Sequence, residues 1–454
     1  MLVNRVERGR YLDSVALMRV SRKLEARPGV EAAALMIGTA SNKDLLRSAR
    51  LLSAEGEGAT PNDLVIAVRG AQAPEALAQA LELLSDKPEP AGPALARVRS
   101  LTGALEALPR ANLALISVPG EFAAYEARRA LERGLHVLLF SDNVSLEDEA
   151  ALKRYAGQKG LLLMGPDCGT AIIAGTPLAF ANALPRGEVG IVSASGTGLQ
   201  EVASLVARMG GGISHGIGVG GRDLDARVGA LGTLAALDAL EADAGTARIV
   251  LISKPPAREV AQRVLQRVKQ SAKPCVVCFL GLDEPGISPT LTHAAERVMG
   301  RSLQRETFSL QKPKPGRVRG LYCGGTLCAE AELIFRRKGL EGHEFIDLGA
   351  DEYTRGRPHP MIEPEMRNDH LARALADPAV GVILVDLVLG YGAHENPAAV
   401  LLRNNLSKTV VASITGTEQD PQGWSRQAAL LRSAGVQVAA SNAHAAELAA
   451  QLAG

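Results

Sequence analysis

The sequence predicts an α/β protein built around several parallel sheets. Apolar residues make up 46% of the 454 residues, aromatic residues only 3%, and the chain carries 47 glycines. That composition is typical of α/β proteins rich in Ala, Leu and Val. Short apolar runs also alternate with segments of helical spacing along most of the chain, which is the pattern of strands followed by covering helices.

The first segment, residues 1–90, is predicted to be a small α/β domain. Its apolar runs and its helical patterns alternate: strands are expected at 2–6, 32–37 and 63–68, and helices at 13–26, 41–53 and 74–85. Asp13 is the expected N-cap of the first helix. The domain ends at "DKPEPAGPAL" (86–95), and a similar segment, "QKPKPG", occurs at 311–316. Both lack an apolar period and are rich in proline, so we expect two linkers.

Between the linkers, the predicted strands are continuous apolar runs rather than alternating ones. They are "NLALISV", "HVLLF", "GLLLMG", "VGIVSA", "GISHGIGVG", "IVLISK" and "PCVVCFL". Strands buried on both faces of a parallel sheet have this pattern. Because the runs are too many for one small sheet, we divide the region near Gly187 into a Rossmann-like domain (96–186) and a flavodoxin-like domain (187–311).

The last segment, residues 316–454, is predicted to be a second flavodoxin-like domain. Its "VRGLYCGGTLCAEAELIFRRKG" repeats the strand, glycine turn and helix of residues 189–210, and "VGVILVDLVLG" and "TVVASITG" supply further buried strands. The central and final parts of the chain are therefore expected to be related halves.

Charge and cysteine content exclude several classes of function. The 50 basic residues are matched by 49 acidic ones with no polybasic run, so neither a nucleic acid nor a membrane partner is expected. Five cysteines in apolar strands or turns predict free thiols and a reducing, cytoplasmic compartment. The start of the sequence is unlike a signal peptide, and no apolar stretch is long enough to span a membrane. Cys168, Cys275 and Cys278 are interpreted as core residues, and no metal site is expected.

Two glycine turns carry the strongest functional signal. "VGIVSASGTGLQEVASLVARMG" (189–210) runs from a strand through Ser193–Gly198 directly into a helix, and Cys323–Thr326 forms a similar turn. A helix start presents several backbone amides and the positive end of the helix dipole, which favours an anion by ~0.3 to 1 kcal/mol. If both turns face one dianion, their combined field becomes sizeable. The alternative is that both are simply tight turns in which glycine allows close packing.

Two groups of motifs resemble known families. Within residues 111–282, "LLLMGPDCGT", "VGIVSASGTGLQEV" and "GVGGRDL" resemble the α subunit of succinyl-CoA synthetase and related acyl-CoA synthetases. Within residues 317–454, "GGTLCAEAELI", "FIDLGAD" and "ILVDLVLGYGA" resemble the C-terminal domain of the β subunit. The resemblance implies a CoA-binding-type Rossmann domain and two synthetase-type flavodoxin-like domains. It also implies that both helix starts hold one phosphoryl group.

The whole chain is similar to the FdrA family, a fused member of this superfamily. The motifs are "LDSVALM", "FSDNVSLEDE", "MGPDCGT", "IAGTPLAFAN", "SKPPA", "YTRGRPHPMI" and "GTEQDPQ". The resemblance implies allantoin catabolism and oxamate carbamoyltransferase chemistry, in an oligomeric complex with two companion subunits. Oxalurate and phosphate would be exchanged with oxamate and carbamoyl phosphate, from which a carbamate kinase can make ATP.

Four departures from the synthetase pattern bear on mechanism. No region is left for an ATP-grasp domain. The nearest counterpart of the phosphorylated histidine is His293 in "LTHAAERVM", which is either a phosphoryl carrier or an exposed helix residue. Lys254 stands where the synthetases have an acidic residue. The chain also enters the Rossmann-like domain without a Gly-x-x-Gly element, which argues against CoA, so no cofactor is expected.

These considerations assign roles to individual residues. Those expected to bind phosphate are Ser193, Ser195, Gly196, Thr197, Gly198, Gly324, Gly325 and Thr326. Lys254, Asn143 and Asp167 are expected to be catalytic, through charge neutralisation and orientation of the amide. Those expected to contact the rest of the substrate are Thr170, Gly220, Gly221, Arg222, Arg355, Arg357 and His359. As alternatives, Asn143 and Asp167 cap turns, and the arginine loop is a subunit contact.

Two other functions remain open at this point. The chain could be an acyl-CoA synthetase subunit that works with an ATP-grasp partner and binds CoA in residues 96–186. It could also be a non-catalytic scaffold whose phosphate site is allosteric, with the chemistry in a companion subunit.

Overall fold

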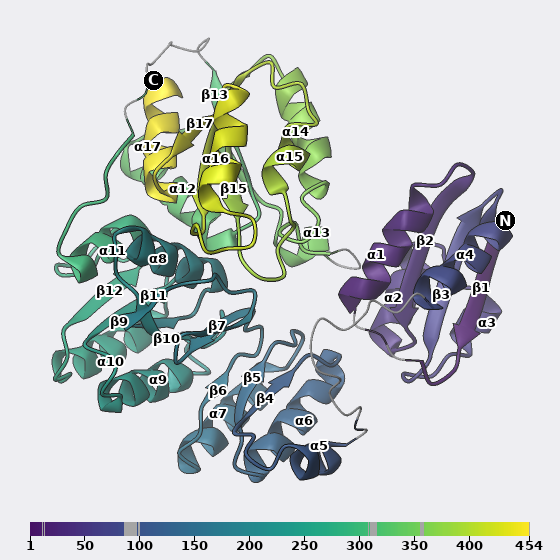
Figure 1. The fold of residues 1–454 in the computed structure, drawn as a ribbon, viewed down its shortest axis with the longest axis horizontal. Helices are drawn as coiled ribbons and strands as arrows, with labels where there is room; N and C mark the ends of the chain where they lie inside the picture. Colours follow the sequence, from purple (N-terminus) through teal and green to yellow (C-terminus); the bar gives the residue numbers. More distant parts are fainter. Residues whose placement is uncertain are drawn as a thin grey trace. The chain divides into compact units, whose positions relative to one another are not determined.

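A computed structural model of the protein describes residues 1–10, 12, 14–85, 98, 100–306, 308, 316–354 and 358–453. The chain divides into two compact units, Met1–Arg97 with Ala350–Pro358 and Val98–Gly349 with His359–Gly454. Asp13, the linker at 86–95 and all of the linker at 311–316 except Gly316 lie outside the described residues. The fold is α/β with four sheets in the described residues, so the predicted class is confirmed (Figure 1).

The first unit contains an antiparallel sheet with the strand order β1-β3-β2. Its elements are β1 (Leu2–Glu7), α1 (Ser14–Glu25), β2 (Val30–Ile37), α2 (Ala40–Ser48), α3 (Ala54–Glu57), β3 (Leu64–Gly70) and α4 (Ala73–Ser85). Central strand β3 is an unbroken apolar run because it is buried on both faces. Leu17 and Leu24 of α1 pack with Ala76 and Ala80 of α4 on one of those faces.

The second unit begins with a small parallel sheet in the order β4-β5-β6. Its strands are β4 (Leu113–Ile116), β5 (His136–Leu139) and β6 (Leu163–Met164), and its helices are α5 (Leu101–Ala107), α6 (Gly120–Glu132) and α7 (Leu146–Gln158). These elements match the expected Rossmann-like pattern of a strand followed by a helix. The sheet contains three strands in the described residues.

The next sheet has six strands in the order β12-β11-β9-β10-β7-β8. Its elements are β7 (Thr170–Ile173), β8 (Thr176–Ala179), β9 (Arg186–Ser193), α8 (Gly196–Arg208), β10 (Ile213–Gly218), α9 (Leu231–Ala242), β11 (Arg248–Ser253), α10 (Arg258–Lys269), β12 (Cys275–Phe279) and α11 (Leu291–Met299). Strands β9 to β12 are parallel in the flavodoxin-like order 2-1-3-4. The hairpin β7-β8 pairs antiparallel with β10, so this sheet begins before the expected boundary near Gly187.

The last sheet has the order β14-β13-β15-β16-β17 and is wholly parallel. Its elements are β13 (Arg317–Tyr322), α12 (Gly325–Arg337), β14 (Glu344–Asp347), α14 (Met366–Ala376), β15 (Val380–Val388), α15 (Pro397–Leu401), β16 (Thr409–Thr415), α16 (Trp424–Ser433), β17 (Gln437–Ala439) and α17 (Asn442–Ala453); α13 (Asp351–Thr354) lies in the first unit. In chain order this is the flavodoxin-like order 2-1-3-4-5. The expected repetition of one architecture in the two halves is present.

The two halves pack through four helices, α8 and α11 from the central half and α12 and α17 from the final half (Figure 1). One hydrophobic core runs through all four, with Val202, Ala294, Ala331 and Ala446 among its buried residues. The many alanines of α17 leave room for close packing of the helices.

Two buried glutamates hold this interface in a reciprocal way. Glu201 of α8 accepts a hydrogen bond, 3.0 Å long, from the backbone amide of Asn442, the first residue of α17. Glu330 of α12 accepts one of 2.6 Å from the amide of Leu291, the first residue of α11. Each half therefore caps the last helix of the other half with a carboxylate.

Candidate functional site

The first of the two glycine turns is a well-formed helix start. Ser195 is the N-cap of α8, and its hydroxyl accepts the Gly198 amide at 2.9 Å. The Ser193 hydroxyl accepts the Ser195 amide at 3.0 Å and donates to the Ser195 carbonyl at 2.7 Å. Within the described residues, the amides of Gly196 and Thr197 have no protein acceptor. Two donors are thus left for an external group.

The second turn is partly occupied by a carboxylate of the protein itself. The amides of Cys323 and Gly324 donate to the two oxygens of Asp386 at 2.7 and 2.8 Å, and Asp386 is ion-paired with Arg367 at 2.8 Å. Asp386 is fully buried. This corrects the expectation for Gly324, whose amide is not available to phosphate. In the described residues, the amides of Gly325, Thr326 and Leu327 at the start of α12 have no protein acceptor.

The structure brings the two helix starts into direct contact. The hydroxyl oxygens of Ser195 and Thr326 are 2.6 Å apart. Lys254, which follows β11, extends to the start of α12. Its Nζ would lie 3.1 Å from a β-carbon built at Gly325. Lys254 is exposed, and Gly196, Thr197 and Gly325 are partly exposed. Amides, hydroxyls and an ammonium group therefore lie close together beside partly exposed backbone, a combination that suits a small anion.

Two further polar groups lie beside the start of α12. A β-carbon at Gly325 would also clash with Asp347 Oδ2, at the end of β14. A β-carbon at Gly349 would lie 2.6 Å from His359 Nε2 and 3.2 Å from Asp347 Oδ1. Burial lowers the pKa of His359 to about 4, so its ring is neutral at neutral pH. Sequence reasoning included His359 but missed Asp347 and Asp386, although each is an acidic residue in an apolar strand.

Several other expected residues line the turns around this point. Thr170 lies against Gly196, with its Oγ1 3.1 Å from a β-carbon built there, and donates its hydroxyl to the Phe180 carbonyl at 2.8 Å. Gly220 has φ +85°, and a side chain there would meet the Pro166 carbonyl. A β-carbon at Gly221 would lie 3.9 Å from the carbonyl of Ala194, next to the first turn.

Asn143 and Asp167 are exposed residues in turns. Their φ angles are +54° and +55°, a conformation that Asn and Asp tolerate better than most residues. The Asp167 amide donates to the Ser141 carbonyl at 3.0 Å. Their backbone geometry agrees with the turn-forming alternative. Arg355 and Arg357 lie outside the described residues.

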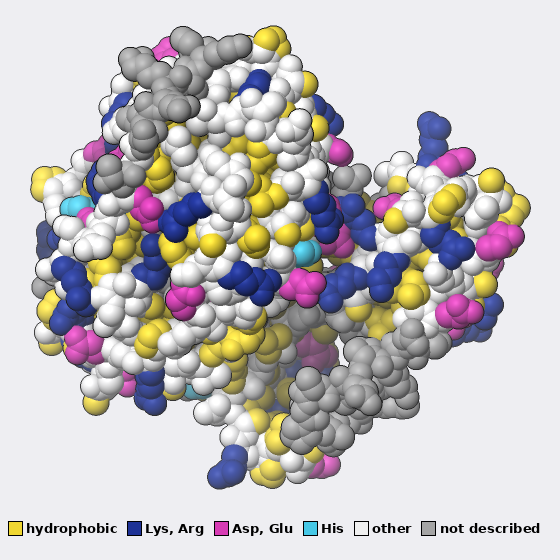
Figure 2. Space-filling model, turned by 45° about the horizontal axis from the view of Figure 1, so that its top comes forward, with side chains coloured by type: hydrophobic (Ala, Val, Ile, Leu, Met, Phe, Trp, Pro, Cys, Tyr) yellow, Lys and Arg dark blue, Asp and Glu magenta, His cyan; other side chains and the backbone are white. Residues whose placement is uncertain are grey.

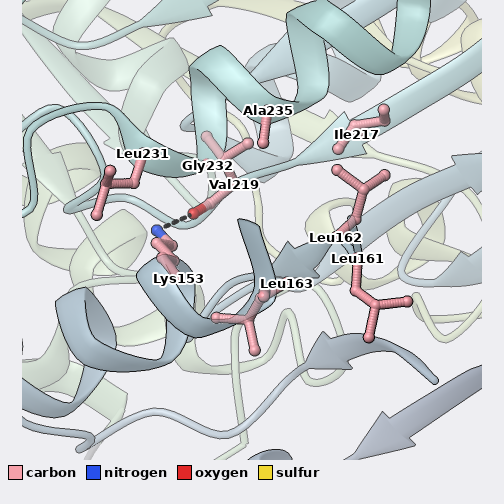
Figure 3. A pocket seen from close by; sticks show the side chains of 10 residues that line it. Lys153, Leu161, Leu162, Leu163, Ile217, Val219, Leu231, Gly232 and Ala235 are labelled. Carbon is pink, nitrogen blue, oxygen red and sulfur yellow. Dashed lines mark hydrogen bonds between the residues drawn. The ribbon is translucent and has the colours of Figure 1, made fainter. Parts of the chain in front are cut away.

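Arg222 lies at the exposed edge of a buried ionic cluster. Its guanidinium lies 2.9 Å from Glu149 of α7 and donates to the Val144 carbonyl at 2.8 Å. Lys153 Nζ contacts Glu149 and Asp223, each at 2.7 Å. It also donates to the Val219 carbonyl at 2.8 Å (Figure 3). Because Lys153, Glu149 and Asp223 are buried, each charge requires its partner. The cluster fixes the 218–223 loop, and the expected substrate contact Arg222 is engaged in it through Glu149.

The remaining titratable candidates have structural positions. His293 is exposed on helix α11. All five cysteines are free, as predicted. Burial raises the pKa of Cys168 to about 12 and raises that of Cys278 further, so neither is a thiolate at neutral pH. Cys275 and Cys278 pack into different hydrophobic clusters, which confirms their interpretation as core residues.

The surface and the helices agree with the charge analysis. On the face drawn in Figure 2, Lys and Arg side chains are scattered among Asp and Glu rather than gathered in one tract. Within the described ranges, the helices are too short or too polar to cross a bilayer.

Two family models match the chain. A CoA-ligase model matches residues 321–452, and a model described as AllF, heavy metal-associated domain, matches residues 1–97. Those first 97 residues contain neither Cys nor His. They therefore offer no thiolate or imidazole ligand, and the domain does not fit a soft metal ion.

Several individual proteins are also similar to this chain. YahF of Escherichia coli (strain K12), itself described as uncharacterized, is 41% identical over 95% of this chain and 95% of its own length. The alpha subunit of ADP-forming succinate–CoA ligase from Methanothermobacter thermautotrophicus is 28% identical over 38% of this chain and 59% of that subunit. Among solved structures, PH0766 from Pyrococcus horikoshii OT3 covers 75% of this chain and 83% of its own, with 19% identity and a TM-score of 0.31.

Proposed function

Because the chain belongs to the same family as Escherichia coli YahF, we propose that it is an FdrA-like subunit of a cytoplasmic carbamoyltransferase complex. It exchanges oxalurate, or a similar ureido acid, and phosphate with oxamate and carbamoyl phosphate. The observation that supports this most is the 2.6 Å contact between Ser195 and Thr326, because it joins two amide-rich helix starts from separate halves.

Phosphate is the group that these helix starts suit. The unpaired amides of Gly196 and Thr197 point from one helix, and those of Gly325, Thr326 and Leu327 from the other. Lys254 supplies a positive charge beside Gly325. Together they stabilise the dianion that departs when a nucleophile attacks the acyl carbon of carbamoyl phosphate. Direct attack requires no covalent enzyme intermediate, so neither an ATP site nor a phosphohistidine is needed.

The amide substrate is expected next to the same point. Thr170 lies against Gly196 and Gly221 lies near the Ala194 carbonyl, which supports a place for the substrate beside the first helix start. His359 Nε2, the Cys323 carbonyl and Asp347 Oδ1 would all lie close to a β-carbon built at Gly349. We keep Asn143, Asp167, Arg355 and Arg357 as proposed substrate contacts from the family resemblance.

An acyl-CoA synthetase subunit is the second candidate. It is favoured by the CoA-ligase model over residues 321–452 and by the similarity to a succinate–CoA ligase alpha subunit. In that case an ATP-grasp partner would phosphorylate the acid, and the same helix starts would hold the phosphoryl group. The two candidates differ in whether ATP and CoA are consumed.

The test uses the full chain, purified alone and together with the products of neighbouring genes. One assay supplies carbamoyl phosphate and oxamate and measures phosphate and oxalurate. The other supplies ATP, CoA and a short carboxylic acid and measures acyl-CoA. We expect product in the first assay; product in the second alone would favour the synthetase. Activity that is unchanged when both glycine turns are disrupted would favour the scaffold.

A further inference from the structure

The carboxylate of Asp347, at the end of β14, lies beside the start of α12. Its Oδ1 accepts the Gly349 amide at 3.0 Å, which holds the side chain in place. Its Oδ2 lies so close to Gly325 that a β-carbon there would overlap it, and the same β-carbon would be 3.1 Å from Lys254 Nζ. Asp347 is partly exposed. Asp347 Oδ2 and Lys254 Nζ are thus both close to Gly325, the first residue of α12.

The nearby histidine presents an N–H group, and not a free lone pair, on the side of Asp347. Its Nδ1 accepts the backbone amide of Met361 at 3.2 Å, so in the neutral ring the proton is on Nε2. That nitrogen lies on the Asp347 and Cys323 side of Gly349. Burial lowers the pKa of His359 to about 4. His359 is therefore a hydrogen-bond donor at this site.

The other titratable groups around the start of α12 are also unsuited to accept a proton. Asp386 is fully buried and holds two amides and Arg367. Burial raises the pKa of the Cys323 and Cys328 thiols well above their usual range. Lys254 is a cation. Of the groups considered, Asp347 is the carboxylate with an oxygen at the first residue of α12.

Resting on the carbamoyl transfer proposed above, we propose that Asp347 is the catalytic residue that takes the proton from the attacking amide nitrogen. That nitrogen forms a bond to the carbamoyl carbon, and the bond from this carbon to the bridging phosphate oxygen breaks with its electron pair on phosphate. The amide proton passes to Asp347 Oδ2 and then to the departing phosphate, which leaves as hydrogen phosphate. In the reverse direction, Asp347 returns this proton to the oxamate nitrogen.

The test compares Asp347→Asn with the unaltered chain in the complex with its companion subunits. Asparagine keeps the size of the side chain but cannot accept the proton, so kcat for carbamoyl phosphate and oxamate should fall by at least about 100-fold. Phosphate affinity, measured by calorimetry, should be unchanged or tighter, and the acid-side fall of kcat with pH should disappear. Glu344→Gln, at the other end of the same strand and exposed, is the matched control and should keep full activity.

A second variant tests the geometry without removing the carboxylate. Gly325→Ala adds a methyl group that displaces Asp347 Oδ2 and crowds Lys254, while alanine is favoured in a helix; kcat should again fall. Asp347→Asn with activity within threefold of the unaltered complex would overturn this inference alone. No product with the unaltered complex would instead overturn the carbamoyl transfer on which it rests.

Discussion

Ser195 and Thr326 are 131 residues apart in the chain, and their hydroxyl oxygens are 2.6 Å apart in the structure. Each lies at the start of a helix that follows the first of the parallel strands in its flavodoxin-like sheet. The two hydroxyls therefore mark where the two halves jointly present their helix dipoles. An anion bound here would interact with both halves at once.

The first prediction concerns Ser195→Asp. Aspartate is a good N-cap, so α8 should still form, but a negative charge at this point should repel phosphate. We expect the phosphate dissociation constant, measured by calorimetry, to rise at least 100-fold. Ser100→Asp is the matched control, since Ser100 caps α5 by accepting the Gly103 amide as Ser195 accepts that of Gly198. Equal phosphate affinity in both variants would exclude Ser195 from the site.

The second prediction concerns Lys254→Met. Loss of the ammonium group next to Gly325 removes one charge-assisted contact with phosphate. The KM for carbamoyl phosphate should rise about tenfold or more, and its dependence on salt concentration should weaken. Lys254→Arg should recover part of the affinity. Lys269→Met, on the exposed end of α10, is the control, and an equal effect there would mean that Lys254 acts only through net charge.

The third prediction concerns Asp386→Asn. This change leaves Arg367 without its buried partner and puts an amide group where two backbone donors need a carboxylate. Breaking a buried ion pair costs about 3–5 kcal/mol, so the midpoint of urea unfolding should fall clearly. Replacing both residues, Arg367→Met with Asp386→Asn, should cost less than the sum of the single changes. If the effects of the two single changes on stability simply add, Asp386 and Arg367 do not stabilise the fold as a pair.

The fourth prediction concerns pH and Glu330. Burial raises the pKa of Glu330 to about 7 in the folded protein, while the unfolded chain has the ordinary value near 4.3. As pH rises, Glu330 therefore loses its proton at a lower pH in the unfolded chain than in the folded protein. The free energy of unfolding should fall as pH rises between the two pKa values and stay constant above the higher one. The expected loss is on the order of 3 kcal/mol.

Glu330→Gln removes this titration, so the urea midpoint should vary less between pH 5 and pH 7.5 than in the unaltered chain. Glu332→Gln, two residues along the same helix and exposed, should leave the pH dependence as it is. A Glu330→Gln protein with an undiminished pH dependence would show that another group is responsible, such as Glu201, whose pKa burial also raises.

Much of the fold could be predicted because buried parallel strands can be recognised as apolar runs in the sequence. The run "VGVILVDLVLG" corresponds to β15, and the glycine turns fall at the starts of α8 and α12 as expected. The boundary near Gly187 was misplaced because the hairpin β7-β8 joins the following sheet. Its turn residues Ala174 and Gly175 both have positive φ, which is a hairpin signal. Which strand the hairpin then pairs with depends on tertiary packing.

The site was only partly predictable for a related reason. Glycine and hydroxyl residues in a strand-to-helix turn indicate an anion site locally. Asp386 lies 62 residues beyond Gly324 in the chain, and no local pattern shows that its carboxylate occupies that turn. Arg222 was expected to contact the substrate, yet its guanidinium is paired with Glu149, which lies in a different domain.

The exchange of helix caps by Glu201 and Glu330 makes the central and final halves resemble two subunits that share one chain. A tether between such halves keeps them at one-to-one stoichiometry and at an effective concentration on the order of millimolar. The joint anion site then persists on dilution, when separate subunits would dissociate. Cutting the chain between residues 308 and 316 should therefore make assembly of that site depend on protein concentration.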